Sequence, residues 1–226
     1  MNTFILGATG LCGNAFLKYA NKSDKVSQIT TITRRKLADT YDNNTKINQI
    51  INKNSEEWVN EVPKGLDVVF TSLSTTKGAA GSLENQYKID HDLNLQLLEK
   101  AKENGCKTVV LISSSGANEH SWAGYLKMKG EIERDVTKLG FDHTIILRPG
   151  VLLGERDSQN FKGFGNSFAS TIGSFLYGTR FQSLGFDPIY GDDVGKVSLH
   201  LAENAENAEK VQIIGPKELL NLSKTL

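Results

Sequence analysis

The sequence is poor in cysteine and has no long apolar run. Only Cys12 and Cys106 occur among 226 residues, so no disulfide framework can form and the chain fits a reducing compartment. No apolar run approaches the roughly 20 residues that a membrane-spanning helix needs. These shortages exclude a disulfide-stapled secreted domain, and we expect a soluble protein without a transmembrane segment.

An excess of charge of one sign is also missing. The 26 Lys and Arg residues balance 26 Asp and Glu residues, so no overall field would draw the protein to nucleic acid or to an anionic membrane. The first residues, MNTFILGATG, lack the Arg-rich, amphipathic character of a transit peptide. Cleavage there would remove what looks like the first strand. We therefore expect an intact N-terminus and no nucleic-acid partner.

Patterns for a metal site or a carboxylate pair are absent too. The histidines are scattered without metal-ligand spacing, and with two cysteines no zinc site is predicted. They are His91, His120, His143 and His200. Asp90 and Asp92 fall within or beside a predicted long helix. Solvation or local hydrogen bonding is expected for them rather than catalysis as a pair.

What the chain does have is an alternation of strand and helix patterns. The predicted strands are TFILG, ITTIT, INQII, LDVVFTSL, KTVVLIS and HTIILRP. Helices are predicted at about 11–20, 56–61, 85–104 and 123–139. Several strands are almost continuously apolar, which is typical of strands buried on both faces of a parallel sheet. The alternation predicts right-handed βαβ units and a doubly wound, mostly parallel α/β sheet.

Regularity weakens in the C-terminal third. GERDSQNFKGFGNSFASTIGSFLYGTRFQSLGFD is rich in Gly, Ser and Phe and predicts loops with at most one helix. A helix is then expected to begin near Asp192 or Asp193, which are good N-caps. The strand KVQII and a helix after Pro216 follow. We expect one domain over residues 1–226, with residues 150–226 forming a small irregular cap.

A glycine-rich turn follows the first predicted strand. G-A-T-G-L-C-G places Gly7, Gly10 and Gly13 between this strand and a helix. Missing side chains there permit a tight turn and close approach of the backbone to a pyrophosphate. The helix N-terminus adds N–H groups and the positive end of its dipole. The alternative is a glycine turn that binds nothing, but the strand-turn-helix setting favours dinucleotide binding.

The second predicted strand ends in a basic turn. Arg34 and Arg35 lie about 20 residues past the last glycine, with Lys36 next and no acid before Asp39. An acid at this point reads the ribose of NAD, whereas an arginine suits the 2′-phosphate of NADP. Guanidinium groups bind phosphate in a bidentate manner. The turn therefore favours NADP(H), with a solvated basic turn as the alternative.

Polar residues gather after a central strand. KTVVLIS runs into three serines, so Ser113, Ser114 and Ser115 lie at the carboxyl end of a strand, where open α/β sheets bind ligands. Tyr125 and Lys129 lie one helical turn apart on the next predicted helix. Serines, tyrosine, lysine and the glycine turn would converge on one crevice. Taken alone, the serines could merely end a strand and the Tyr–Lys pair could be an exposed helix face.

Together these motifs resemble the short-chain dehydrogenase/reductase superfamily, in its atypical branch. The resemblance rests on G-A-T-G-L-C-G, the arginine pair, L-S-T-T-K-G-A-A-G-S, Y-K-I-D-H-D-L-N-L, S-S-S-G-A, Y-L-K-M-K and I-L-R-P-G-V-L-L-G-E-R. From about Thr3 to at least Glu155 the chain is similar to the fungal mitochondrial Fmp-type family and the animal Tat-interacting oxidoreductases. The resemblance implies a Rossmann fold that binds NADP(H). For the fungal members it also implies peripheral residence at the mitochondrial outer membrane; a cytoplasmic location is expected otherwise.

The resemblance also implies roles for the polar residues. Tyr125 resembles the general acid/base that gives a proton to a carbonyl oxygen or takes one from an alcohol. Lys129 supplies a charge that favours the phenolate and holds the nicotinamide ribose. Ser114 or Ser115 orients the carbonyl oxygen, and we expect Ser114 because it follows directly on Ser113, the last residue of the strand.

Further residues are expected around the cofactor by the same resemblance. Pro149 and Gly150 resemble the turn beside the nicotinamide, with Val151 and Leu152 on its wall. Leu73 and Ser74 resemble the loop over the adenosine. The residues expected near the phosphates are Thr9, Gly10, Leu11 and Cys12.

Two functions remain open at this point. One is an NADP(H)-dependent oxidoreductase for a small carbonyl compound or alcohol, and the other is an NADP(H)-binding regulator with little turnover. Relatives that became sensors often lack the tyrosine or the lysine, which this chain retains, so the enzyme is favoured. Neither the substrate nor the oligomeric state is specified. Seven aromatic residues could line a substrate pocket, although most are expected in the core: Phe161, Phe164, Phe168, Phe175, Tyr177, Phe181 and Phe186.

Overall fold

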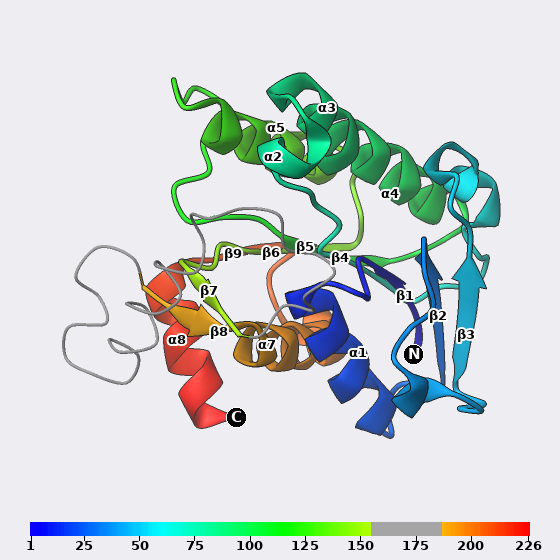
Figure 1. Cartoon of the computed structure of the whole chain (residues 1–226). Coiled ribbons are helices and arrows are strands. Elements are labelled where there is room, and N and C mark those ends of the chain that lie inside the picture. Colours follow the sequence, from blue (N-terminus) through cyan, green and yellow to red (C-terminus); the bar gives the residue numbers. More distant parts are fainter. Residues whose placement is uncertain (155–186) are drawn as a thin grey trace.

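A seven-stranded sheet forms the centre of the protein (Figure 1). The structure is a computed structural model and describes residues 1–154 and 187–226. The strand order is β3-β2-β1-β4-β5-β6-β9, and every neighbouring pair is parallel. The strands are β1 (Asn2–Leu6), β2 (Gln28–Thr33), β3 (Ile47–Ile51), β4 (Val68–Thr71), β5 (Thr108–Ile112), β6 (His143–Leu147) and β9 (Val211–Ile214). The predicted parallel α/β sheet is confirmed.

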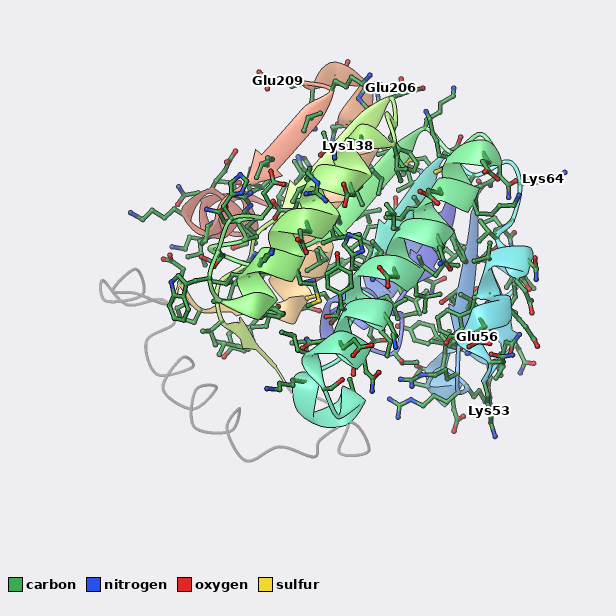
Figure 2. All side chains as sticks on the ribbon, turned by 90° about the horizontal axis from the view of Figure 1, so that it is seen from above. Lys53, Glu56, Lys64, Lys138, Glu206 and Glu209 are labelled. Carbon is green, nitrogen blue, oxygen red and sulfur yellow. The ribbon has the colours of Figure 1, made fainter. Side chains whose placement is uncertain are left out.

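Helices cover both faces of this sheet (Figure 1). On one face lie α1 (Leu11–Lys22), α7 (Gly191–Glu203) and α8 (Pro216–Thr225). On the other lie α4 (Asn94–Glu103) and α5 (Gly124–Lys138), preceded by the short helices α2 (Lys77–Ala80) and α3 (Leu83–Tyr87). Figure 2 views the molecule from the side of α4 and α5 and shows the charged side chains of Lys53, Glu56 and Lys64 extending outward at the periphery. The fold is therefore doubly wound, as predicted.

Strand alternation explains how one sheet serves two cores. On β1, Phe4 and Leu6 pack under the α4 and α5 side, whereas Ile5 packs under the α1 and α7 side. All residues of β5 are buried, because successive side chains point to opposite faces and each face is covered. Burial on both faces is the reason that the strand sequences are continuously apolar.

The strand order also fixes where ligands are expected. The chain runs from β1 outward to β3 and then returns to place β4 on the other side of β1. Such a reversal opens a crevice at the carboxyl ends of the two central strands, where open α/β sheets bind their ligands. The loops after β1 and β4, at Gly7 and Leu73, border this crevice.

The predicted helix at 85–104 is divided into three segments. Helix α3 leads into a π-helical segment, η3 (Lys88–Leu93), and then into α4. The Ser82 side chain accepts a hydrogen bond from Asn85 N and so caps the start of α3. The predicted helix near Glu56 is a 3₁₀ helix, η2 (Ser55–Glu61), and a second one, η1 (Asp39–Tyr41), was not predicted.

The start of α7 differs from the prediction. The helix begins at Gly191 with Tyr190 as its N-cap, and no side chain caps it. The expected N-cap at Asp192 or Asp193 is therefore wrong, because both residues lie in the first turn. The Asp192 carboxylate instead accepts a hydrogen bond from Tyr19 Oη at 2.6 Å and pairs with Lys18 on α1.

Among the C-terminal residues that the structure describes, several belong to the main sheet and its covering helices, and the expected cap over residues 150–226 stays a prediction. Strand β9 joins the main sheet beside β6, and α7 and α8 pack on its face. A separate pair, β7 (Leu152–Leu153) and β8 (Ile189–Tyr190), joins the chain on either side of residues 155–186. The seven aromatic residues between Phe161 and Phe186 lie outside the described residues, so their expected places stay predictions.

Candidate active site

The three glycines of the first turn each lie where a side chain would not fit well. Gly7 has a φ of +82°, and a Cβ on it would lie 2.9 Å from Leu73 N. A Cβ on Gly13 would lie 2.1 Å from Gly7 O, and one on Gly10 would lie 3.2 Å from the same atom. The turn is closed by a hydrogen bond from Gly10 N to Gly7 O at 2.9 Å. Backbone thus packs directly on backbone where β1 passes into α1.

This geometry fits a dinucleotide. Gly10 is the N-cap of α1 and brings no capping side chain, and the first turn of α1 contains no acid. The positive end of the helix dipole therefore lies just past the carboxyl end of β1, without an acid in the first turn of α1 to compete for it. Thr9 and Leu11 on either side of Gly10 are half-buried, and Cys12 is buried. These residues could hold the pyrophosphate of a nicotinamide cofactor, and this role stays a prediction.

Leu11 links this turn to the C-terminal third. A Cβ on Gly154 would lie 2.7 Å from Leu11 Cδ1, and one on Gly191 would lie 2.3 Å from Leu11 Cγ. The Leu11 side chain therefore occupies space left by two glycines that are far away in sequence. Leu152, on β7, packs against the same core as α1. The expected wall residue Leu152 thus lies on the side of the sheet that carries the glycine turn.

The basic turn follows β2 as predicted. Arg34 is exposed and Arg35 is half-buried. Lys36 pairs with Asp39 at 3.2 Å and with Asp42 at 2.6 Å, and these hydrogen bonds raise the pKa of Lys36 above its ordinary value. The charge of Lys36 is therefore matched by nearby acids.

The loop after β4 is held by buried polar groups. Leu73 is half-buried and Ser74 is exposed, and the carbonyl oxygen of Leu73 accepts a hydrogen bond from Asn94 Nδ2 at 2.8 Å. Thr75 N donates to Asp90 Oδ1 at 2.7 Å. Gln86 Nε2 donates to the carbonyl oxygen of Thr75 at 3.0 Å. This network fixes the loop beside Gly7.

The serines lie at the carboxyl end of β5. Ser113 is buried and its Oγ has no hydrogen-bond partner within the described chain, Ser114 is half-buried, and Ser115 is exposed. Ser115 N donates to the carbonyl oxygen of Pro149 at 2.9 Å. The serine loop is thereby joined to the turn at Pro149, and the two expected features of the site meet.

Tyr125 and Lys129 differ sharply in burial. Tyr125 is 42% exposed, whereas Lys129 is only 4% exposed. Lys129 Nζ donates to the carbonyl oxygen of Ile112, the last residue of β5, at 3.3 Å. The ammonium thus lies at the strand end that leads into the serines, while the phenol one turn earlier is open to solvent. Lys129 is therefore anchored to the sheet, whereas Tyr125 lies on an exposed part of α5, and the catalytic role of the pair stays a prediction.

A glycine brings the serine loop onto α5. A Cβ on Gly130 would lie 2.1 Å from Glu119 N and 2.2 Å from Asn118 C. The loop between the serines and α5 therefore rests on the helix backbone directly after Lys129. Asn118 N also donates to the carbonyl oxygen of Leu126 at 3.0 Å. This contact fixes the loop relative to Tyr125.

Asp90, which the sequence places in or beside a helix and for which no catalytic role was expected, is buried close to Lys129. It is 1% exposed, and burial raises the pKa of its carboxyl while the charge of Lys129 lowers it. Of the two expectations for Asp90, local hydrogen bonding is confirmed and solvation is wrong. The π-helical segment that carries Asp90 is the signal in the structure, since such segments are frequent at functional sites. The sequence pattern of a π turn is too weak to have found it.

The histidine nearest the site has a structural environment. His91 is 6% exposed; its Nδ1 lies 2.9 Å from Asp92 Oδ1 and its Nε2 lies 3.2 Å from Asp135 Oδ2. Tyr87 stacks on its ring at a centroid distance of 4.5 Å. Within residues 1–154 and 187–226, no group of three or more His, Cys, Asp or Glu side chains is arranged to hold a metal ion.

None of the helices that the structure describes combines the length and the apolar composition needed to cross a bilayer.

Comparison with known proteins identifies close relatives. A sequence profile described as NAD(P)H-binding matches residues 7–171. The chain is 48% identical over 228 residues to Protein FMP52, mitochondrial, of Saccharomyces cerevisiae, covering 100% of this chain and 98% of that protein. It is 49% identical over 225 residues to the protein of the same name from Kluyveromyces lactis, covering 99% of each.

Solved structures show the same fold at low sequence identity. MoeE5 in complex with UDP-glucose and NAD superposes with a TM-score of 0.69 and 15% identity, covering 100% of this chain and 81% of that one. The UDP-N-acetylglucosamine 4-epimerase from Methanobrevibacter ruminantium gives a TM-score of 0.68 and 21% identity, covering 95% and 75%. These likenesses show a Rossmann-type fold.

Proposed function

Because the chain belongs to the FMP52 family, an atypical branch of the short-chain dehydrogenase/reductases, we propose that it is an NADP(H)-dependent oxidoreductase for a small carbonyl compound or alcohol. One observation carries the proposal. The Lys129 ammonium is buried and held at the carboxyl end of β5, one helical turn from the exposed phenol of Tyr125. A lysine that only solubilised the helix would extend into water.

The residues of the site divide the chemistry among them. When bound, the nicotinamide supplies or accepts the hydride. In the reducing direction Tyr125 Oη gives a proton to the carbonyl oxygen of the substrate, and in the oxidising direction it takes the proton of the alcohol. The positive charge of Lys129 favours the phenolate that remains after proton donation. Lys129 would also hold the ribose of the nicotinamide when the cofactor is bound.

A serine hydroxyl orients the substrate oxygen. We assign this role to Ser114, whose Oγ, within the part of the chain that the structure describes, donates only a long hydrogen bond, 3.4 Å, to the carbonyl oxygen of Ser115. A weakly engaged hydroxyl can turn toward a substrate at little cost. Ser115 is the alternative, and separate Ser114→Ala and Ser115→Ala variants tell the two apart.

We further propose NADP(H) rather than NAD(H) as the cofactor. Arg34 and Arg35 stand where the fingerprint reads the adenosine ribose, and the turn contains no acid before Asp39. Two guanidinium groups suit the 2′-phosphate, which only NADP(H) carries.

A screen of aldehydes, ketones and quinones for NADPH oxidation tests the proposed activity. The matched control is Tyr125→Phe, which keeps the ring and removes the hydroxyl. Turnover that the wild-type chain shows and the Phe variant loses supports the assignment. Turnover that is equal in both removes Tyr125 from the mechanism.

A second candidate function is an NADP(H)-binding regulatory or interaction protein with little turnover. Trp122 favours it, because this indole is 98% exposed only three residues before Tyr125, and exposed aromatic side chains are common in protein interfaces. Tight NADPH binding without turnover of any compound in the screen would favour this second function.

We propose that the protein resides in mitochondria, as a peripheral protein of the outer membrane. The support is the word "mitochondrial" in the names of the relatives and the family resemblance. Fractionation of cells followed by alkaline carbonate extraction tests both parts. Recovery in the cytosol alone would contradict the location, and resistance to carbonate would contradict peripheral attachment.

A further inference from the structure

The basic turn after β2 is anchored at its two ends and lacks regular structure in between. Thr33 is the buried last residue of β2, and Leu37 is buried in the core under α1. Arg34 and Arg35 lie between these anchors. Without further contacts the backbone of such a turn samples many conformations, and fixing each residue costs conformational entropy.

One side chain of the neighbouring strand spans this turn. Gln49 lies in the middle of the edge strand β3. Its Nε2 donates to Thr33 Oγ1 at 2.8 Å and to the carbonyl oxygen of Arg35 at 3.2 Å. Its Oε1 accepts from Leu37 N at 3.3 Å. The amide thus contacts the residue before the arginine pair, the pair itself, and the residue that ends the turn.

A hydroxyl completes the arrangement. Thr33 Oγ1 accepts from Gln49 Nε2 and donates to the carbonyl oxygen of Arg35 at 2.7 Å. These bonds also settle how the Gln49 amide is oriented. Exchanging its oxygen and nitrogen would set oxygen against the Arg35 carbonyl oxygen and nitrogen against the Leu37 N–H.

Lys36, which follows the arginine pair, makes its contacts outside the turn. Lys36 pairs with Asp39 and Asp42 in the direction of η1. The bonds of Gln49 thus hold the segment that carries Arg34 and Arg35. The charge of Lys36 is paired with Asp39 and Asp42 instead.

We propose that Gln49 is a specificity-determining positioning residue, which holds the Arg34–Arg35 turn in the conformation that receives the 2′-phosphate of NADP(H). The inference rests on the cofactor preference proposed above. A turn fixed in advance loses little conformational entropy when ligand binds, so affinity is gained by preorganisation. Only a ligand with a 2′-phosphate uses the two guanidinium groups, so Gln49 acts on NADPH affinity and leaves NADH affinity almost unchanged.

The test compares dissociation constants for NADPH and NADH, measured by fluorescence titration. Gln49→Leu keeps the size of the side chain and removes its hydrogen bonds. We expect the NADPH preference to fall roughly five- to tenfold, or about 1–1.4 kcal/mol, with NADH affinity changed less than about twofold. The matched control is Gln28→Leu, an exposed glutamine at the start of β2, which should leave both affinities unchanged.

The same Gln49 substitution in a chain without the two arginines shows whether Gln49 acts by positioning them or by contacting the cofactor itself. In a chain that already carries Arg34→Ala and Arg35→Ala, adding Gln49→Leu should not change the ratio of the two affinities, because nothing is left to position. Thr33→Val removes the hydroxyl at constant size and should lower the preference in the same direction, which keeps the test open if Gln49→Leu fails to fold.

Three results would overturn the inference. They are an unchanged preference in folded Gln49→Leu, an equal loss of NADPH and NADH affinity, and a further loss of preference in the arginine-free background. If the wild-type chain binds both cofactors equally, the proposed NADP(H) preference fails and the positioning role fails with it. A preference that survives Gln49→Leu rejects the positioning role alone.

Discussion

Lys129 donates a hydrogen bond to the carbonyl oxygen of Ile112, at 3.3 Å, across the boundary between α5 and β5. The bond joins the helix that carries Tyr125 to the strand that carries the serines. Because Lys129 is 4% exposed, its ammonium has lost most of its contact with water and depends on such partners. The position of the ammonium is therefore set by the sheet and not by the flexibility of a surface side chain.

Replacing Tyr125 by Phe should reduce turnover by roughly 10²–10⁴-fold, because general acid/base catalysis contributes about that factor. NADPH affinity should stay nearly unchanged, since in the proposed mechanism the phenol contacts the substrate oxygen more than the cofactor. Steady-state kinetics on the best substrate of the screen, together with fluorescence titration of NADPH, measures both quantities. Full activity in this variant would exclude Tyr125 as the proton donor.

Replacing Lys129 by Met should lower both turnover and NADPH affinity. The substitution roughly keeps the volume of the buried side chain and removes its charge, so the core is disturbed little. In the proposed mechanism, the charge of Lys129 favours the phenolate of Tyr125 and its ammonium holds the nicotinamide ribose, so the substitution should remove both effects. The same two measurements apply, with Lys127→Met as the control at an exposed position of α5. A variant that lost turnover at unchanged NADPH affinity would contradict the ribose contact.

Replacing Gly13 by Ala should destabilise the protein and lower its affinity for both NADPH and NADH. The added Cβ would lie 2.1 Å from Gly7 O, so α1 must move away from β1, at a cost of roughly 1–3 kcal/mol. Thermal unfolding and titration with NADPH and NADH test the two effects. Gly78→Ala is the control, because the nearest atom to its Cβ would be 4.0 Å away. An unchanged affinity for both cofactors in a clearly destabilised Gly13 variant would contradict a role of the glycine turn in cofactor binding.

Replacing Arg34 and Arg35 together by Ala should remove most of the preference for NADPH over NADH. Each charge-assisted hydrogen bond to phosphate contributes on the order of 1.5–3 kcal/mol, and NADH makes no such bond. The ratio of the two dissociation constants measures the preference, and the salt dependence of NADPH binding should weaken in parallel. Equal dissociation constants in the wild-type chain would refute the preference at the outset.

Replacing Asp135 by Asn should destabilise the protein at neutral pH and much less in acid. The hydrogen bonds from Arg134, at 2.8 and 2.6 Å, hold the pKa of Asp135 well below its ordinary value of 3.8. A carboxyl with a lowered folded-state pKa stabilises the protein above pH 3.8, and this contribution is lost as the pH falls through the folded pKa.

Thermal unfolding between pH 7 and pH 3 measures this effect. We expect Asp135→Asn to lower the Tm at pH 7 by roughly 2–4 °C, with a difference from wild type that shrinks as the pH falls below 3.8. Asp142→Asn is the control, since Asp142 is exposed and its pair with Lys102 at 3.4 Å is on the surface. A Tm difference for Asp135→Asn that stayed constant over this pH range would contradict the argument.

The strands and the glycine turn were predictable because their signals are local. INQII matches β3 residue for residue, and G-A-T-G-L-C-G lies where β1 meets α1. Apolar runs report burial on both faces of a sheet, and glycines report where backbone approaches backbone. Both signals can be recognised in the sequence without knowledge of the tertiary structure.

The features that were missed depend on contacts between distant segments. Asp192 is a good N-cap by composition, but α7 begins one residue earlier, where Gly191 makes room for Leu11. Solvation and local hydrogen bonding could not be distinguished for Asp90 before its burial under the β4 loop was known. Nothing in the sequence indicates a role for Gln49, because polar residues are common in edge strands. Its role can be inferred only from its hydrogen bonds to Thr33 and Arg35.

The contacts of Leu11 have a consequence for how this protein can evolve. The chain passes this leucine at Gly154 and again at Gly191, and β7 and β8, which directly precede these two glycines, pair with each other. The ends of the intervening stretch are thus joined to each other and to the first helix. Lengthening a loop whose ends are already fixed costs little, about 0.6 kcal/mol for each doubling. We therefore expect insertions and replacements between β7 and β8 to be accommodated while the main sheet remains as it is.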